Sequence, residues 1–412
     1  MPKVLVIGGG AAGLMAAYSA ASLGAEVTLL ERNPRPARKV MITGKGRCNV
    51  TNNTDLNGLV NAVTGNGRFL YSAFSNFSSA DTMNFFERYG VSLKTERGNR
   101  VFPESDKAVD IVDALVRAVK DVGVKILQER VIELILENGA VMGVKCESGR
   151  EIFADSVIVA TGGLSYPLTG STGDGYNLAK SVGHTVTELR PSLVPVNVAE
   201  GWCSDAQGLS LKNISVSVFK GESNKPIYTD FGELMFTHYG LSGPVILSAS
   251  AYIKEPESCD YKVVIDLKPA LSDEKLDERL LRDFEDNKNK DFINSLGELL
   301  PRKLIPIIVK LSKIEPSAKI NQITREQRQG LVKLLKNLTL TVTGFRPIDE
   351  AIVTKGGISL SEVIPKTMES KIVSGLYFAG EVLDVDAFTG GFNLQIAFST
   401  GYSAGESAGS RY

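Results

Sequence analysis

The chain has 412 residues, a formal net charge of −1, 43% hydrophobic residues and 23% charged residues. This length accommodates about two or three domains, and the near-neutral charge excludes a globally basic surface for nucleic acid or membranes. The four cysteines are far apart and only two histidines occur. We therefore expect no disulfide framework, no structural metal site and a reducing cytosol. No apolar run approaches the ~20 residues of a membrane span, so we expect no membrane insertion.

The N-terminus combines a strand, a glycine-rich turn, a helix and a second strand. Residues 3–7 form an apolar run, and the sequence GGGAAG follows directly over residues 8–13. A helical pattern occupies residues 14–23, and a second apolar run over residues 26–30 ends at Glu31. This order of elements is a complete βαβ fingerprint, which predicts dinucleotide binding.

Each residue type in the fingerprint has a physical role. We expect Gly8 to permit the tight turn, Gly10 to let backbone N–H groups approach a pyrophosphate, and Gly13 to let the helix pack against the strand. The helix N-terminus supplies positive potential. The carboxylate at position 31 is placed to accept the hydroxyls of an adenosine ribose. The predicted contacts from this segment are Gly8, Gly10, Ala11, Ala12, Gly13, Glu31 and Arg32.

A basic, glycine-rich stretch follows Glu31 in the chain and covers residues 38–52. Its glycines permit close backbone approach, so we interpret it as a loop along the pyrophosphate and ring system of the dinucleotide. The alternative is a solvated basic turn. For the cysteine in this loop, a redox role beside the cofactor and a packed structural position are both open. The predicted contacts are Arg38, Lys39, Thr43, Gly44, Gly46, Arg47, Cys48 and Asn49.

The next segments have the patterns of a helix followed by short strands. Helical spacing of apolar residues covers 106–122, and Asn138-Gly139 and Ser148-Gly149 mark hairpin turns. A buried strand over Ser156–Ala160 leads into Thr161-Gly162. The strand-like runs before it cover residues 124–127, 131–136, 141–146 and 151–153.

The middle of the chain differs in character from both ends. Residues 191–271 are β-rich, with one helix predicted to start at Ser242 as N-cap and Pro244 in its first turn. Residues 272–338 look helical and strongly charged, and strand-and-glycine patterns return over 339–412. We therefore predict a cofactor domain split between 1–190 and 339–412, with a β-rich domain and a helical subdomain inserted between its halves.

The order of predicted elements along the chain indicates which dinucleotide is bound. A β-meander and an apolar strand ending in Thr161-Gly162 follow the first βαβ unit, and a late strand ends in Gly380-Glu381. This order resembles the FAD domains of the glutathione-reductase-like superfamily. The resemblance implies that the late glycine and acid lie near the ribityl and pyrophosphate groups, although the superfamily commonly has Asp rather than Glu there. The final helix, beginning near Asn393, would direct its N-terminus at the flavin. The further predicted FAD contacts are Val131, Thr161, Gly162, Gly380, Glu381, Gly391, Phe392, Asn393 and Leu394.

Two sequence motifs that are absent narrow the class of flavoprotein further. No second G-x-G-x-x-G follows a strand, which argues against a second Rossmann domain of the pyridine-nucleotide disulfide reductase kind. No C-x-x-C motif lies near the predicted flavin, which argues against disulfide chemistry.

Four separated motifs resemble one family, the BaiN-like or YhiN-type flavoproteins, which includes an aminoacetone oxidase. They are KVMITGKGRCNVTN over 39–52, GNRVFPES over 98–105, FTHYGLSGP over 236–244 and FAGEVLDVDAFTGGFNLQ over 378–395. The resemblance covers the full chain. It implies a split, Rossmann-type α/β FAD domain, an inserted β-barrel-like domain, a small helical domain and tightly held FAD. Activities within the family vary between oxidation of small amino-ketones, reduction of conjugated double bonds and formation of dihydrouridine in ribosomal RNA.

His238 is the candidate catalytic residue. It stands immediately before the predicted helix at Pro244, where it would serve as a general acid or substrate anchor. An exposed histidine in an ordinary capped turn is the alternative. Arg100 has the same two interpretations, a contact to substrate or FAD and a surface salt bridge. We assign His184 to structure.

Residues 299–336 are locally basic and could hold RNA phosphates. A solvated helical surface is the competing interpretation. Nine cations face only two acids, Glu315 and Glu326, in this segment: Arg302, Lys303, Lys310, Lys313, Lys319, Arg325, Arg328, Lys333 and Lys336.

The sequence as a whole predicts an FAD-dependent oxidoreductase. We expect hydride transfer between flavin N5 and a small-molecule substrate at the interface of the FAD and inserted domains, with NADH or NADPH as transient reductant for C=C reduction. Two alternatives stay open: an O₂-using oxidase of a small amino-ketone such as aminoacetone, and a flavoprotein that reduces a uridine of ribosomal RNA to dihydrouridine.

Overall fold

The computed structural model describes residues 1–411 and divides the chain into two compact units. The first unit, here called the Rossmann unit, joins Met1–Ser192 to the C-terminal segment that starts at Pro347. The second, here called the barrel unit, is Leu193–Arg346. Each unit has its own cluster of buried apolar side chains. The barrel unit is therefore inserted between the two segments of the Rossmann unit.

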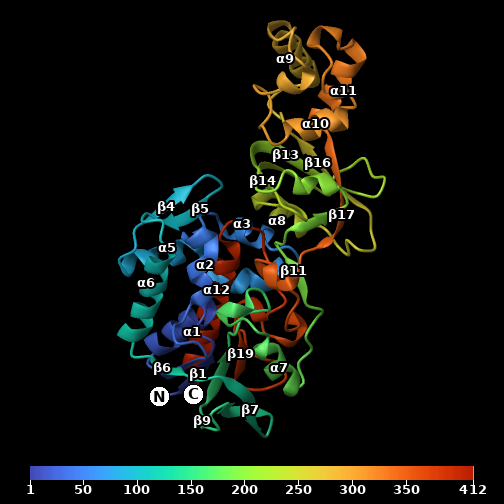
Figure 1. Ribbon diagram of the computed structural model, residues 1–412. Coiled ribbons are helices and arrows are strands. Elements are labelled where there is room, and N and C mark those ends of the chain that lie inside the picture. Colours follow the sequence, from blue (N-terminus) through green and yellow to red (C-terminus); the bar gives the residue numbers. More distant parts are fainter. Residues whose placement is uncertain (412) are drawn as a thin grey trace. The chain divides into compact units, whose positions relative to one another are not determined.

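A five-stranded parallel sheet forms the centre of the Rossmann unit, in the order β19-β10-β1-β2-β6. Strands β19, β1 and β6 of this sheet are labelled in Figure 1. The strands are short and apolar because the sheet is covered on both faces. Strands from both ends of the chain meet here, since β10 pairs with β1 on one side and with β19 on the other. The strands are β1 (Lys3–Ile7), β2 (Glu26–Glu31), β6 (Lys125–Gln128), β10 (Ser156–Val159) and β19 (Leu376–Phe378).

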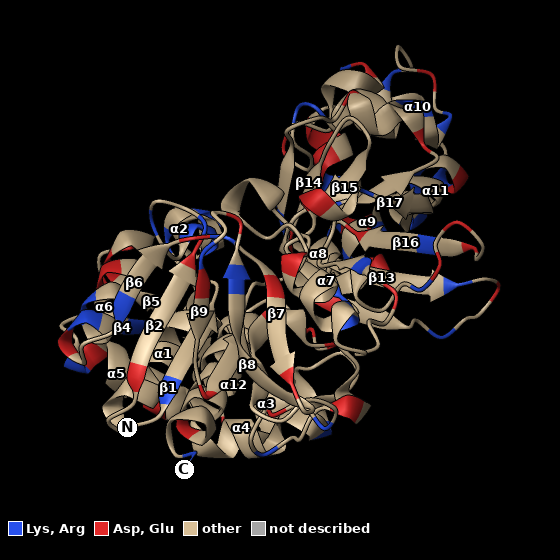
Figure 2. Cartoon of the chain, turned by 90° about the horizontal axis from the view of Figure 1, so that it is seen from below, with Lys and Arg blue, Asp and Glu red and all other residues tan. Residues whose placement is uncertain are grey.

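Helices α1 (Ala11–Ser22) and α12 (Phe392–Gly409) pack against one another with their backbones almost in contact. A Cβ atom added at Gly401 would lie 2.3 Å from the Ala12 carbonyl oxygen, and one at Gly405 would lie 2.2 Å from the Ala16 carbonyl oxygen. Glycine is therefore required along this face of α12. The two helices carry one charged residue between them and are drawn almost wholly without charge colours (Figure 2).

The remaining Rossmann-unit elements surround this centre. Asn138 and Gly139 both have positive φ, at 50° and 78°, which forms the predicted hairpin turn of the meander. The meander strands are β7 (Val131–Glu137), β8 (Ala140–Cys146) and β9 (Glu151–Phe153). The other strands are β3 (Thr51–Asn52), β4 (Leu93–Glu96), β5 (Arg100–Pro103), β11 (Arg190–Ser192) and β18 (Val353–Lys355). The other helices are α2 (Arg38–Ile42), α3 (Leu56–Asn61), α4 (Tyr71–Asn76), α5 (Ser79–Arg88), α6 (Ala108–Asp121) and α7 (Asp174–Ser181).

The barrel unit is built on a closed barrel with the strand order β12-β15-β14-β13-β16-β17. Apolar residues alternate along its strands, so one side chain in two faces the interior. The strands are β12 (Val196–Val198), β13 (Ser210–Lys220), β14 (Tyr228–Phe236), β15 (Gly240–Ser242), β16 (Tyr261–Asp266) and β17 (Leu338–Phe345). The helices are α8 (Pro244–Ser250), α9 (Asp273–Asp286), α10 (Ile305–Ser312) and α11 (Arg325–Lys336).

The structure corrects three boundaries drawn from the sequence. The chain re-enters the Rossmann unit at Pro347 rather than at 339, because alternating side chains of β17 such as Leu340 and Val342 are buried in the barrel unit. The cap of α8 is Gly243, since Ser242 is the last residue of β15. Helix α1 begins at Ala11 rather than Leu14, because the glycine turn is shorter than expected.

Among residues 1–411, no helix is both long and apolar enough to cross a membrane. The same residues contain no cluster of three or more side chains that could hold a metal ion.

Candidate functional site

A cavity lies in the Rossmann unit, where strands of the parallel sheet end and the helices α1 and α12 begin. This edge is where open α/β sheets bind ligands. Its lining includes Gly8–Ala12 from the first turn, Glu31–Asn33 after β2, and Ala37–Val40 from α2. Further lining residues are Thr43, Glu129, Arg130, Val131, Ala160–Gly162, Thr169–Ser171, Asp174, Ile352, Val353, Ala379, Glu381, Val385, Asn393, Leu394, Ile396 and Ala397.

The glycine turn forms a cradle at the start of α1. Gly8 has φ of +99°, and a Cβ atom there would lie 2.6 Å from the Ala160 carbonyl oxygen. A Cβ atom at Gly13 would lie 1.8 Å from the Gly8 carbonyl oxygen, so only glycine lets the turn close onto the helix. A Cβ atom at Gly10 would meet no protein atom within 4 Å, and this residue borders the cavity. The space beside Gly10 and the unpaired N–H groups of the first helical turn fit a pyrophosphate.

The carboxylate of Glu31 is fixed at one end of the cavity. Its Oε2 accepts a 2.7 Å hydrogen bond from the backbone N–H of Gly9. Its Oε1 accepts bonds from the backbone N–H and the side-chain amide of Asn33, at 2.7 and 2.8 Å. Glu31 is buried, so these donors compensate for the lost hydration of its charge. A carboxylate held in this way keeps further lone pairs for ribose hydroxyls.

A second carboxylate, Glu381, belongs to an internal network in another part of the cavity wall. Its Oε2 pairs with the ammonium of Lys39 at 2.7 Å. Its Oε1 accepts bonds from the Ser165 hydroxyl at 3.0 Å and from the Thr354 backbone N–H at 2.8 Å. Lys39 also donates to the Ser165 hydroxyl at 2.6 Å. The ion pair leaves little net negative charge beside the space for a pyrophosphate.

Helix α12 begins beside the cavity because a glycine caps it. Gly391 has φ of +97°, and a Cβ atom there would lie 2.3 Å from the Thr51 carbonyl oxygen. The side chain of Asn393 is held by the Ala387 backbone, whose N–H donates to Asn393 Oδ1 at 3.0 Å and whose carbonyl accepts from Nδ2 at 2.7 Å. The positive end of an 18-residue helix therefore faces the cavity.

The lining as a whole fits an extended dinucleotide such as FAD. The glycine cradle, the ordered carboxylate of Glu31 and the start of α12 border one continuous cavity. Thr161 also borders this cavity shortly after β10, but its Oγ1 is buried against Gly175 of α7, where an added Cβ atom would lie 2.1 Å from it.

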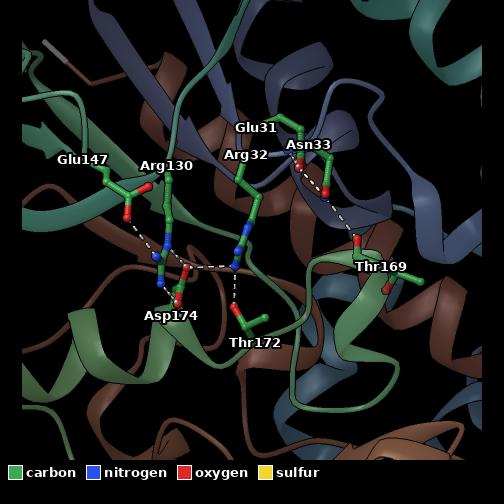
Figure 3. A network of polar contacts seen from close by, with 8 residues as sticks. All are labelled: Glu31, Arg32, Asn33, Arg130, Glu147, Thr169, Thr172 and Asp174. Atoms are coloured by element: carbon green, nitrogen blue, oxygen red, sulfur yellow. Dashed lines mark hydrogen bonds and ion pairs between the residues drawn. The ribbon is translucent and has the colours of Figure 1, made fainter.

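A polar network surrounds the end of the cavity that contains Glu31 (Figure 3). Arg130 binds Asp174 through two hydrogen bonds, from Nε at 2.9 Å and from a terminal nitrogen at 3.0 Å. This guanidinium lowers the pKa of the Asp174 carboxyl, and Asp174 in turn raises the pKa of Arg130. Arg32 donates to the Thr172 hydroxyl at 2.6 Å and also approaches Asp174 at 3.4 Å.

The structure gathers most of the predicted contacts around this cavity. Residues from the glycine turn, from the end of β2 and from the first turns of α1 and α12 border it. The predicted residues that line it are Gly8, Gly10, Ala11, Ala12, Glu31, Arg32, Arg38, Lys39, Thr43, Val131, Thr161, Gly162, Glu381, Asn393 and Leu394.

Other predicted residues do not line the cavity. Gly13 and Gly391 shape the backbone at close contacts instead, and Gly380 makes a turn with φ of +76°. The second half of the basic loop, residues 44–49, also lies outside the cavity lining. The predicted residues outside the lining are Gly13, Gly44, Gly46, Arg47, Cys48, Asn49, Gly380, Gly391, Phe392 and His238.

Arg47 and Cys48 show why the second half of the loop leaves the cavity. Arg47 forms ion pairs with Glu96 and Asp106 and lies over the Phe102 ring at 4.1 Å. Cys48 is fully buried in the core, and burial raises its pKa to about 12. Its thiol is thus protonated near neutral pH, which agrees with the packed rather than the redox interpretation.

His238 lies in the barrel unit, in the turn between β14 and β15, and is exposed. Its ring contacts the Tyr239 ring, with 4.9 Å between the centroids. The guanidinium of Arg346 lies over the same tyrosine ring at 4.4 Å. The catalytic assignment of His238 stays a prediction.

Sequence reasoning misses the polar residues around the cavity end at Glu31. Asn33, Arg130 and Asp174 come from three segments far apart in the chain, and none belongs to a motif. Arg130 directly precedes the strand at Val131, which is the one local signal that could suggest it. Nothing in the sequence of residues 169–171 suggests that they line a binding site.

The basic segment of the barrel unit is partly neutralised. Lys319, Arg328 and Lys336 form ion pairs with aspartates, and Lys303 donates to a backbone carbonyl. Five exposed cations of this segment form no ion pair with any of residues 1–411: Arg302, Lys310, Lys313, Arg325 and Lys333.

Comparison with known proteins gives a consistent result. The family model described as "HI0933-like protein Rossmann domain" matches residues 2–407. A 3-dehydro-bile acid delta(4,6)-reductase of Clostridium scindens is 32% identical, with 100% of both chains covered. A ribosomal RNA dihydrouridine synthase of Escherichia coli is 30% identical over 98% of this chain and 96% of the relative. The solved structure of a 3-ketosteroid-delta4-(5alpha)-dehydrogenase from Rhodococcus jostii RHA1 matches 100% of this chain and 97% of its own, with a TM-score of 0.54 and 15% identity, which shows a shared fold.

Proposed function

We propose, from the premise that this chain belongs to the HI0933-like family and is an FAD-dependent oxidoreductase, that it reduces a carbon–carbon double bond conjugated to a carbonyl group. NADH or NADPH would act as the transient reductant. The full-length relationship to a named double-bond reductase is the observation that carries this proposal.

The relatives' names support one shared chemistry. A delta(4,6)-reductase that acts on a 3-dehydro compound saturates a double bond in conjugation with a ketone. A dihydrouridine synthase saturates the uracil ring at the double bond conjugated to its C4 carbonyl. In both cases the carbonyl withdraws electrons, so the far carbon of the double bond accepts hydride and the near carbon accepts a proton.

The cavity residues divide the binding of FAD among them. We expect the N–H groups of Ala11 and Ala12 to bind the pyrophosphate and Glu31 to bind the adenosine ribose. The N-terminus of α12 would place positive potential at the ring system. When bound, FAD supplies the capacity to carry a hydride.

The proposal is tested by anaerobic reduction of the purified yellow protein with NADH and with NADPH. Enones, free uridine and a ribosomal RNA fragment are then added separately, and products are identified by mass spectrometry. Reoxidation of the flavin with a two-hydrogen gain in an enone is the expected result. If no conjugated alkene reoxidises the flavin while aminoacetone reduces it and O₂ yields peroxide, the proposal is wrong and the oxidase alternative stands.

A second candidate is reduction of a uridine in ribosomal RNA. The relationship to the Escherichia coli protein favours it, as do the five exposed cations of residues 299–336 that form no ion pair within the described chain. Replacing Lys310, Lys313 and Lys333 together by Glu tests it, because phosphate binding by these residues would make turnover of RNA sensitive to the change. Turnover of RNA reduced by about tenfold or more, with turnover of a small enone unchanged, would support this candidate. Equal turnover of RNA by both proteins would exclude a role for this surface.

A further inference from the structure

The segment Tyr166–Gly173, here called the strap, passes along the end of the cavity that contains Glu31. Three strap residues, Thr169, Gly170 and Ser171, form part of the cavity lining. The strap is linked to Glu31 through Asn33, which donates hydrogen bonds to both. The Asn33 amide that donates to Glu31 Oε1 at 2.8 Å also donates to the Thr169 carbonyl at 3.1 Å (Figure 3).

The backbone of the strap lies very close to the side chain of Asn33. Gly170 has φ of +113°, and a Cβ atom there would lie 2.5 Å from Asn33 Nδ2. A side chain at this position would push the strap away from Asn33. The glycine therefore permits a closed arrangement that other residues would prevent.

Side chains rather than sheet pairing hold the strap in place. Its backbone bonds are mostly local, such as Thr169 N–H to the Tyr166 carbonyl and Gly170 N–H to the Pro167 carbonyl. One backbone bond leaves the strap, from Tyr166 N–H to the Asp349 carbonyl at 3.3 Å. Its apolar tip is open to solvent, with Leu168 88% exposed. A segment with few buried apolar contacts and few backbone bonds to its surroundings opens at low free-energy cost.

Two arginines from different segments fasten the C-terminal end of the strap and Asp174, the first residue of the helix α7 that follows it. Arg130, just before β7, binds Asp174 through two parallel hydrogen bonds and is itself paired with Glu147 at 3.0 Å. Arg32, just after β2, donates to the Thr172 hydroxyl at 2.6 Å. Paired N–H···O bonds between Arg and a carboxylate are among the strongest polar contacts in proteins and also fix orientation.

From this arrangement we propose that the strap is a latch over the adenosine end of the cavity, and that Arg130, Asp174 and Arg32 set the rate at which FAD leaves. The inference rests on the proposed function in one respect, that FAD is the bound dinucleotide. The latch residues are positioning residues, since they act by holding the strap closed. Opening of the strap would precede release, so loosening the latch raises the dissociation rate more than it changes the association rate.

The test measures FAD release from purified holoprotein. Release is followed by flavin fluorescence after mixing with an excess of an apo-flavoprotein that traps free FAD. Asp174→Asn is expected to release FAD about tenfold faster than the parent, because a charge-assisted bidentate pair is lost. Arg130→Lys keeps the charge but loses the paired geometry, and an intermediate rate is expected.

Asp106→Asn is the matched control. Asp106 also forms ion pairs, with Arg47 and Lys94, but lies outside the cavity lining. The control is expected to release FAD at the parental rate. If Asp174→Asn does not fold, Thr172→Val removes only the hydroxyl that binds Arg32 and is expected to raise the release rate by a smaller factor.

The experiment distinguishes failure of the latch proposal from failure of the proposed function. A parent protein that neither contains FAD nor binds it when FAD is added overturns the proposed function itself. A parent that binds FAD, with release rates of Asp174→Asn and Thr172→Val within twofold of the parent and of Asp106→Asn, overturns only the latch.

Discussion

Three glycines of the first turn meet different physical demands, although they belong to one motif. Gly8 needs a positive φ and Gly13 needs the absence of a side chain beside the Gly8 carbonyl. Gly10 needs neither, since its φ is −80° and a Cβ atom there would meet no protein atom within 4 Å. The fold therefore does not require glycine at position 10, and we propose that this glycine leaves space for the ligand.

Gly10→Val is expected to fold with close to parental stability but to bind FAD at least tenfold more weakly, because the new side chain occupies cavity space. Gly13→Val is expected to lower stability by several kcal/mol, because its Cβ overlaps the Gly8 carbonyl. Urea denaturation of the apoproteins and FAD titration separate the two effects. A Gly10→Val protein that binds FAD normally would contradict this assignment of the cavity.

His184 is buried between two partners. Its Nδ1 lies 3.1 Å from Glu362 Oε2, and its Nε2 lies 2.7 Å from the Ser370 hydroxyl. Ser370 Oγ accepts bonds from the backbone N–H groups of Ile372 and Val373, so its own hydrogen is directed to Nε2. The arrangement resembles a nucleophile triad in connectivity, but the serine is buried and outside the cavity lining, so it is structural.

Burial lowers the pKa of His184, while Glu362 opposes this effect. The unfolded chain then binds a proton more readily than the folded chain, since an unperturbed histidine has a pKa of about 6.5. The stabilisation is therefore present above about pH 6.5 and is lost as the pH falls towards the lower folded value, by at most about 1.4 kcal/mol per pH unit. Urea midpoints at pH 7.5 and 5.5 should differ less for His184→Gln than for the parent. An equal pH dependence of both proteins would remove His184 from this role.

At the scale of elements, the contact between α1 and α12 joins the two halves of the Rossmann unit. Glycines at every fourth position of α12 lie on alanine-rich turns of α1, which lets the two helix backbones approach closely. Both helices also begin at the cavity. Close packing here therefore fixes the relative position of the two positive helix ends that face the ligand.

Gly405→Leu is expected to lower the free energy of unfolding by several kcal/mol and to weaken FAD binding, because a Cβ at this position would lie 2.2 Å from the Ala16 carbonyl oxygen. Gly330 is the control, since it lies in α11 and a Cβ atom there would meet no other atom within 4 Å. Gly330→Ala is expected to raise stability by about 0.5–1 kcal/mol through helix propensity. Thermal or urea unfolding measures both, and a neutral Gly405→Leu would show that α12 moves away freely.

Elements with strong local patterns can be predicted from the sequence. The first strand is predicted with its observed bounds, Lys3–Ile7, because its apolar run and the glycine turn agree. The meander turns at Asn138-Gly139 and Ser148-Gly149 are predictable because positive φ demands such residues. Strand β17 is assigned to the wrong unit, since only the closure of a barrel tells its alternation from that of an edge strand.

The candidate site is predictable where it follows the backbone motif and not where it depends on side chains from distant loops. The glycine turn and Glu31 are close in the chain, so their spacing identifies them. Arg130 and Asp174 meet only after the sheet has formed, and neither stands out in composition. Arg47 resembles a cofactor contact because the loop is basic, but Glu96 and Asp106 from other segments neutralise it.

At the scale of the whole molecule, the two units have separate apolar cores. The chain contains one tryptophan, Trp202, which belongs to the barrel unit and packs near Phe236 with 5.8 Å between ring centroids. The cavity belongs wholly to the Rossmann unit. Tryptophan fluorescence and flavin signals thus report on different units.

We expect urea unfolding to show two transitions rather than one, because separate cores need not unfold together. Excess FAD should raise the midpoint of the flavin-release transition, since a ligand stabilises only the unit that binds it. The midpoint of the Trp202 fluorescence change should stay constant as FAD concentration rises. Coincident midpoints that shift together with FAD would show that the two units unfold as one.

The parallel pairing of β10 with β19 has a consequence for biosynthesis. On the ribosome, the first strands emerge long before β19 and α12 are translated, and the barrel sequence emerges between them. The barrel can therefore mature while the sheet still lacks its last strand. Because Ala379, Glu381 and Asn393 line the cavity, we expect cofactor loading to follow the emergence of these last elements, and a nascent chain stalled before residue 376 to carry no flavin.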